Sequence, residues 1–239
     1  MIKGLTQKWS NPCFICGSEM VFFRRFMRCF FHHFYHNFAW TYDFVASIVS
    51  IGRWDEWVQS VIPFIHGDKI LEIGHGPGHL QELLYNNNRL AVGLDESLQM
   101  GKITKRRLLK AGHSRYKLSR GRGENLPFAA DTFDTIVSTF PTEYIFDELT
   151  LTEIHRVLHE EGQIVILPAA WIVGQSFFDL GAAWLFRITG QVPAFPQAII
   201  SQRLKPSFEK TGFNPVFQTV EIKSSIVLIV IANKLTGGI

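Results

Sequence analysis

The chain has 239 residues, and its 24 Lys and Arg against 21 Asp and Glu give a formal net charge of +3 at neutral pH. This charge is too small to predict a nucleic-acid partner. Hydrophobic residues make up 46% of the chain, which excludes a largely disordered protein. There is no secretory signal and no uncharged apolar run long enough to span a bilayer, so we expect a cytoplasmic protein.

The first 20 residues are expected to be a flexible lead-in. They hold Cys13 and Cys16, and Cys29 follows in the next segment. Three cysteines cannot form a fully paired set of disulfides, and no second cysteine pair completes a zinc knuckle. We therefore expect reduced thiols and no metal site.

Residues 21–66 are predicted to form cap helices. Phenylalanine recurs every fourth residue from Phe22 to Phe38, and a polar stripe that includes His36 runs beside it. This spacing is typical of an amphipathic helix. The phenylalanine stripe would either pack on the rest of the domain or lie in a membrane interface, so peripheral membrane contact through residues 22–44 is one of two interpretations. Further helices are expected over 43–50 and 54–65.

From residue 67 onwards, short β-branched runs alternate with helical stretches, as in an α/β domain. The predicted strands are 69–73, 90–94, 116–119, 133–139 and 163–167, and the predicted helices are 79–85, 97–111 and 148–158. Two last strands, 213–222 and 225–232, are separated by a short turn and predict an antiparallel hairpin. The expected fold of residues 67–239 is thus a Rossmann-like, doubly wound, seven-stranded sheet, interrupted by a nearly uncharged insertion at about 168–212.

A glycine-rich turn follows the first of these strands. Glu72 stands near the end of the strand, and Gly74, Gly76 and Gly78 follow at alternate positions before the next helix. Such a turn lets a ligand approach the backbone, and the helix start offers free N–H groups to it. A dinucleotide site requires G-x-G-x-x-G, whereas this spacing is E-x-G-x-G-x-G. It favours S-adenosylmethionine (SAM) over NAD or FAD.

An acidic residue ends the second strand. Asp95 follows the glycine turn by about twenty residues, where a carboxylate can accept hydrogen bonds from a ribose diol. The alternative is that it caps the helix that begins near Ser97. The preceding glycine turn favours the ribose interpretation.

Four sequence blocks in this order resemble the class I SAM-dependent methyltransferases that act on small molecules. They span residues 71–78, 93–100, 124–138 and 153–162. Upstream, Tyr42 and Asp43 begin a pattern that is similar to one in the ubiquinone/menaquinone C-methyltransferases and the bacterial phosphatidylethanolamine N-methyltransferases. In that pattern the family's Asn is replaced by Ala46.

The resemblance implies a set of cofactor contacts. Glu72 and the three glycine backbones would hold the methionine end of SAM, and Asp95 its ribose. The remaining implied contacts are Tyr42, Glu96, Gly123, Glu124 and Thr139. The family commonly has an Asp that accepts the adenine amino group where this chain has Arg122, and a guanidinium can only donate. We expect Arg122 to point to solvent or to stack on the adenine.

Methyl transfer from a sulfonium depends mainly on alignment, and a base is needed only if the acceptor loses a proton. The catalytic candidates are Tyr144, which follows the fourth strand, and His36. Packing for Tyr144 and a solvated helix face for His36 are the alternatives. The predicted function is SAM-dependent methylation of a hydrophobic or lipid-like small molecule, as in quinone or lipid metabolism. The second interpretation is a SAM-binding module without catalysis.

Overall fold

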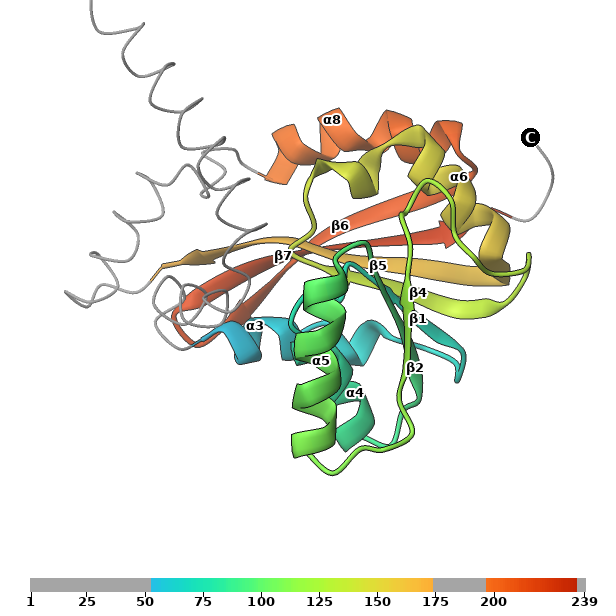
Figure 1. The fold of residues 1–239 in the computed structure, drawn as a ribbon. Helices are drawn as coiled ribbons and strands as arrows, with labels where there is room; N and C mark the ends of the chain where they lie inside the picture. Colours follow the sequence, from blue (N-terminus) through green and yellow to red (C-terminus); the bar gives the residue numbers. More distant parts are fainter. Residues whose placement is uncertain (1–52, 174–196, 236–239) are drawn as a thin grey trace, which may run out of the picture. The chain divides into compact units, whose positions relative to one another are not determined.

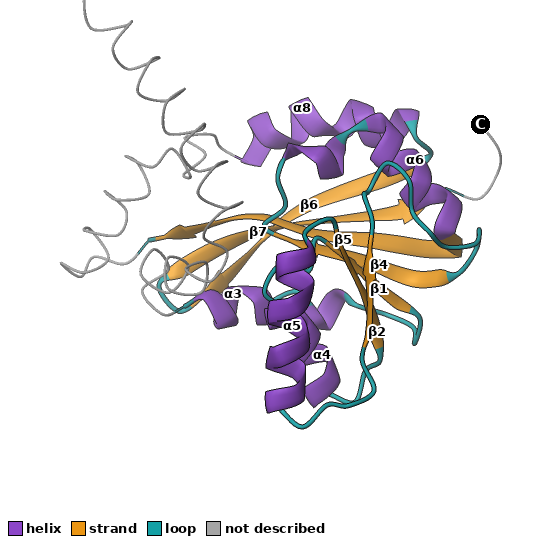
Figure 2. Cartoon of the chain, in the orientation of Figure 1, coloured by secondary structure: helices purple, strands orange, loops and turns teal. Residues whose placement is uncertain are grey.

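The computed structural model describes residues 53–173 and 197–235, which form the sheet and helices of Figures 1 and 2. The predicted lead-in, most of the predicted cap helices and much of the predicted insertion lie outside these residues. So do two of the predicted site residues, His36 and Tyr42.

Seven strands form one sheet in the order β3-β2-β1-β4-β5-β7-β6. Their bounds are β1 Ile70–Ile73, β2 Ala91–Asp95, β3 Lys117–Arg120, β4 Phe133–Thr139, β5 Leu158–Ile172, β6 Phe213–Ile222 and β7 Ser225–Lys234. The first five strands pair in parallel, while β7 runs antiparallel to both β5 and β6. The predicted seven-stranded sheet with a C-terminal antiparallel hairpin is confirmed.

Helices cover both faces of this sheet. Their bounds are α3 Trp54–Gln59, α4 His79–Asn86, α5 Leu98–Lys110, α6 Glu148–Val157 and α8 Gln197–Lys210. Figure 1 shows α6 and α8 on one face and α3, α4 and α5 on the other. All four side chains of β1 are buried, as expected for a parallel strand that is covered on both sides.

Strand β5 is much longer than the predicted 163–167. It begins directly after α6 and continues to Ile172, which pairs with Ser225 of β7. The antiparallel partner supplies hydrogen bonds beyond the point where β4 ends, so the strand extends into the predicted insertion. The pairing shifts between Ile166 and Ala169, where Pro168 has no N–H to donate. The same insertion also contains α8, which packs against β6.

The single helix predicted over 54–65 is wrong. Helix α3 ends at Gln59, and a short 3-10 helix, η2, follows at Ile62–Phe64. Pro63 explains the break, because proline cannot donate the backbone hydrogen bond that would continue the helix to Gln59.

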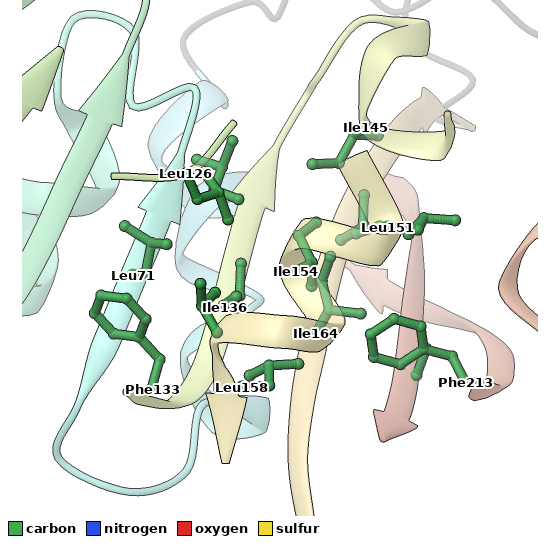
Figure 3. Close-up of a cluster of buried hydrophobic side chains, with 14 of the residues drawn as sticks. Leu71, Leu126, Phe133, Ile136, Ile145, Leu151, Ile154, Leu158, Ile164 and Phe213 are labelled. Carbon is green, nitrogen blue, oxygen red and sulfur yellow. The ribbon is translucent and has the colours of Figure 1, made fainter. Parts of the chain in front are cut away.

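The core consists of two clusters, one on each face of the sheet. Alternate residues of β1 serve different clusters: Leu71 faces the α6 and α8 side, and Ile70 faces the α3 and α4 side. Figure 3 shows Leu151 and Ile154 of α6 in the first cluster beside strand residues such as Ile136. The two clusters fix the ends of β1, β2 and β4 relative to one another.

Within the described residues, no helix is both long enough and apolar enough to cross a bilayer.

Helix α6 offers a matched test of this core. Leu151 is 0% exposed and Leu149 is 71% exposed on the same helix. Leu151→Ala should lower the free energy of unfolding by about 2–5 kcal/mol, because it leaves a cavity against the sheet. Leu149→Ala should change it by less than about 0.5 kcal/mol. Urea unfolding measures both values, and equal losses would contradict the assignment of α6 to the core.

Candidate functional site

The glycine turn after β1 is shaped by left-handed backbone conformations. Gly76 has a φ of +51°, and no described atom lies within 4 Å of the position that a Cβ would take there. Gly78, with a φ of +86°, is the N-cap of α4. A Cβ on Gly78 would lie 2.5 Å from Cγ2 of Thr104, so this glycine permits close packing on α5. One side of the turn therefore packs on the domain, and the other leaves its backbone accessible to a ligand.

Asp95, at the end of β2, holds this turn in place. Its Oδ2 accepts the N–H of Gly76 at 2.9 Å, and its Oδ1 accepts the N–H of Ser97 at 2.8 Å. The N-cap of α5 is Ser97 itself, whose Oγ accepts the N–H of Met100. Each oxygen of Asp95 keeps a second lone pair, so the carboxylate can still accept hydrogen bonds from a diol.

A buried histidine also holds the same turn, through a hydrogen bond to its backbone. His75 is 4% exposed, and its Nδ1 lies 2.8 Å from the carbonyl oxygen of Gly76. The hydroxyl of Thr104, which is fully buried in α5, donates to that same carbonyl at 2.7 Å. Burial is the main influence on the pKa of His75 and lowers it, although Asp95 acts in the opposite direction. The imidazole is therefore a neutral structural group near pH 7.

Glu72 is the most strongly perturbed acid near the turn. Its side chain is 1% exposed, and Oε2 accepts a hydrogen bond from Nε2 of Gln81 at 2.8 Å. Burial raises the pKa of Glu72 to about 8, the hydrogen bond from Gln81 lowers it, and the charge of Asp95 raises it further. The carboxyl group is thus mostly protonated at neutral pH.

Tyr144, in the 3-10 helix η3 (Glu143–Phe146), reaches across two of the predicted cofactor loops. Its hydroxyl lies 2.5 Å from the position of a Cβ on Gly74, and its ring lies 3.4 Å from that on Gly123. Burial raises the pKa of the phenol well above its ordinary value, the nearby carboxylates, Asp95 first among them, add to this, and a hydrogen bond with Ser138 opposes it. The phenol is therefore protonated at physiological pH, so it can donate a hydrogen bond but cannot act as a base.

Arg122 lies on the surface between two predicted cofactor residues. Its side chain is 68% exposed, and its guanidinium is 3.2 Å from Oε2 of Glu96 and 3.6 Å from Oε1 of Glu124. The loop that carries it is joined to the end of β2, because the N–H of Gly121 donates to the carbonyl of Asp95. Arg122 therefore points to solvent, which is one of the two arrangements expected for it.

The predicted residues within the described range gather at the carboxyl ends of neighbouring strands. They come from the turn after β1, the end of β2, the loop after β3 and the end of β4, where Thr139 stands. Sequence reasoning missed three supporting residues: His75, Gln81 and Thr104. His75 lies inside the glycine motif, but a partner 29 positions away leaves no local signal. Gln81 is a buried polar residue that only the fold places beside Glu72.

Comparison with known proteins agrees with this geometry. Residues 70–162 match the family described as a methyltransferase domain. A demethylmenaquinone methyltransferase of Streptomyces griseus is 29% identical over 167 residues, which cover 68% of this chain and 69% of that protein. A second, from Symbiobacterium thermophilum, is 30% identical over 145 residues, covering 55% and 56%.

The fold is shared with solved structures. A SAM-dependent methyltransferase of Thermotoga maritima, described as a possible histamine N-methyltransferase, superposes with a TM-score of 0.59 at 20% identity, covering 85% of this chain and 99% of that one. The chain is a class I SAM-dependent methyltransferase. Its cofactor is SAM, as the resemblance of the four sequence blocks implies.

The described residues fit this cofactor chemically. Among the described residues, no side chain intrudes on the backbone surface at Gly76, and Asp95 has free lone pairs for hydroxyl donors. SAM carries a sulfonium and an ammonium group, and the carboxylates of Asp95 and Glu96 near Tyr144 give the region a negative field. In the methyltransferase, therefore, the turn after β1 and the end of β2 form a site suited to a cationic nucleoside.

The pH dependence of stability tests the buried acid. An unfolded Glu ionises near pH 4.5, whereas Glu72 in the fold ionises near pH 8, so the folded state binds more protons between these values. The contribution of Glu72 to the free energy of unfolding therefore falls as the pH rises through that window. The free energy of unfolding of Glu72→Gln, taken relative to that of the parent, should therefore rise by an amount on the order of a few kcal/mol from pH 5 to pH 8.5. Urea unfolding at both pH values gives the difference.

Glu153→Gln is a suitable control. Its hydrogen bonds with Arg156 lower the pKa of Glu153 below 4.5, so this variant should be less stable than the parent by the same amount at pH 5 and at pH 8.5. If the difference in free energy of unfolding between Glu72→Gln and the parent were the same at both pH values, Glu72 would not be a buried acid with a raised pKa.

The exposed ion pairs of Arg122 yield a second prediction. Because exposed pairs contribute about 0–1 kcal/mol, Arg122→Ala should change the SAM dissociation constant by less than about fivefold. Arg115→Ala, at an exposed position just before β3, removes the same charge and serves as the control. Calorimetric titration with SAM measures both. A loss of more than tenfold for Arg122→Ala alone would show that the guanidinium contacts the cofactor.

Proposed function

We propose that this methyltransferase transfers the methyl group of SAM to a hydrophobic, lipid-like small molecule, with a reduced prenylated naphthoquinone as the first candidate. The supporting observation is that the two relatives described above are named demethylmenaquinone methyltransferases. The nearly uncharged stretch from Gly162 to Gln202 and the phenylalanine-rich residues 22–44 support an apolar acceptor as well.

We assign the cofactor contacts as follows. The backbone of Gly74, Gly76 and Gly78 binds the amino-acid end of SAM, with Glu72 beneath it, and Asp95 binds the ribose. The adenosine end lies near the loop after β3. The residues proposed to complete the site are Tyr42, Glu96, Gly123, Glu124 and Thr139.

The chemistry of transfer constrains the roles of the side chains. SAM supplies a methyl group that is already activated by its sulfonium, so the protein must mainly align the acceptor with it. Tyr144 is suited to orient the acceptor as a hydrogen-bond donor, since its phenol stays protonated. A ring-carbon acceptor must also lose a proton, and His36 is our candidate for the base. Peripheral membrane contact through residues 22–44 would bring the enzyme to such an acceptor.

Asp95 provides the test of the cofactor site. Asp95→Asn replaces one acceptor oxygen by a donor, so SAM should bind at least about tenfold more weakly. Asp131→Asn makes the same substitution just before the amino end of β4, whereas Asp95 stands at the carboxyl end of β2, and it should leave SAM binding unchanged. Fluorescence or calorimetric titration measures the constants, and equal affinities in both variants would refute the assignment.

The acceptor is tested by transfer of a labelled methyl group. Detergent-solubilised demethylmenaquinone, reduced with dithionite, should accept label from SAM. Phosphatidylethanolamine vesicles and histamine are the parallel acceptors. Label in a water-soluble amine only, or SAM binding without transfer to any acceptor, would overturn the proposal.

A further inference from the structure

Phe140, the residue directly after β4, has a left-handed backbone with a φ of +48°. This conformation is rare for bulky side chains and strains the backbone. The other non-glycine residues with positive φ among those described are all polar, and they lie in turns or in the irregular first part of β5. They are Asn88, Asp131, Glu161 and Lys223. The conformation of Phe140 is therefore not explained by ordinary turn chemistry.

Two contacts fix Phe140 in this conformation. Its N–H donates to the carbonyl of Leu167 on β5 at 2.7 Å. Its ring stacks on Trp54 of α3, with the ring centres 4.4 Å apart and an angle of 29° between the planes. The ring of Trp57 lies 6.1 Å away on the inner side. The left-handed turn thus directs the ring towards α3.

The stacked pair continues to the cofactor turn. Trp54 makes an edge-to-face contact, at 6.4 Å, with His79, the first residue of α4 after Gly78. His79 is itself held by Asp55, whose Oδ1 lies 2.8 Å from Nδ1 of the imidazole. We call His79, Trp54 and Phe140 the aromatic strip. It joins the start of the cofactor helix to the carboxyl end of β4, the edge where α/β sheets bind ligands.

Packing alone is a weaker explanation of the strip. Trp57 is 1% exposed and belongs to the core, but Trp54 and Phe140 are only half-buried at the border of the same cluster. Strain that the surrounding structure maintains at a ligand edge is a feature of functional sites.

We propose that the aromatic strip binds the planar ring of the methyl acceptor, which makes that acceptor an aromatic ring rather than a phospholipid head group. This inference rests on the proposed function and narrows its substrate class. A ring stacked on such a strip is held by ring–ring contact in addition to the apolar area that it buries. The strip would hold the ring beside the cofactor turn, while the charged groups around Asp95 bind SAM.

Replacement of Phe140 tests the proposal. Phe140→Leu keeps an apolar side chain but removes the ring, so KM for reduced demethylmenaquinone should rise about three- to tenfold. The SAM dissociation constant should stay within about twofold, because Asp95 and the glycine turn are untouched. Phe140→Tyr keeps the ring and should retain the parent KM. Phe128→Leu removes a half-buried ring on the α6 and α8 side and should change neither constant.

A binding measurement separates this inference from the proposed function. Menadione, a naphthoquinone without the prenyl chain, is titrated into the protein in the presence of S-adenosylhomocysteine, and tryptophan fluorescence is followed. Weaker menadione binding in Phe140→Leu but not in Phe140→Tyr supports the strip, even if the parent transfers no methyl group to the quinol. Methyl transfer by the parent with an unchanged KM in Phe140→Leu would overturn the strip and leave the proposed function standing. An equal loss of SAM affinity in Phe140→Leu would also overturn it.

Discussion

The site depends on the carboxylate of Asp95, which joins two parts of the chain that the sheet alone does not connect. One oxygen holds the turn after β1 through Gly76, and the other holds the start of α5 through Ser97. Since β1 and β2 pair in register from Ile70 to Ile73, Asp95 stands beside the turn that it binds. The arrangement fixes the backbone before any ligand arrives, so little order has to be gained on binding.

The groups around this carboxylate share a consistent electrostatic pattern. His75 and Glu72 are buried, and burial favours the neutral form of each near pH 7. Tyr144 stays protonated for the same reason. Asp95 is half-buried and Glu96 is exposed, so negative charge is concentrated at the outer edge of the site. A cationic cofactor would contact negative charge at this outer edge and neutral, hydrogen-bonded groups in the buried part of the site.

Much of the fold was predictable because its signals are local. The β-branched runs, the helical spacing and the glycine turn each occupy a few residues, and they specify β1, β2, β4 and the helices between them. The length of β5 was not predictable, since it depends on pairing with β7 about 60 residues later. The end of α3 was predictable in principle, because Pro63 marks it in the sequence.

The residues of the site likewise divide into those that the sequence spacing identifies and those that only the fold brings together. Glu72, Asp95 and the glycines were recognisable from their spacing, whereas the contacts that support them join distant segments, as Thr104 and His75 do. Phe140 carried no signal, because nothing in its neighbours requires a left-handed backbone. Arg122 was recognised as a departure from the family pattern, but its pairing with Glu96 and Glu124 appears only in the folded chain.

A crystal structure of the protein with S-adenosylhomocysteine is the most direct test of the central claim that Asp95 and the glycine turn form the cofactor site. We predict that both ribose hydroxyls donate to the oxygens of Asp95, while the hydrogen bonds from Gly76 and Ser97 remain. The account would be contradicted by a ribose bound elsewhere, or by an Asp95 that must release Gly76 in order to bind it.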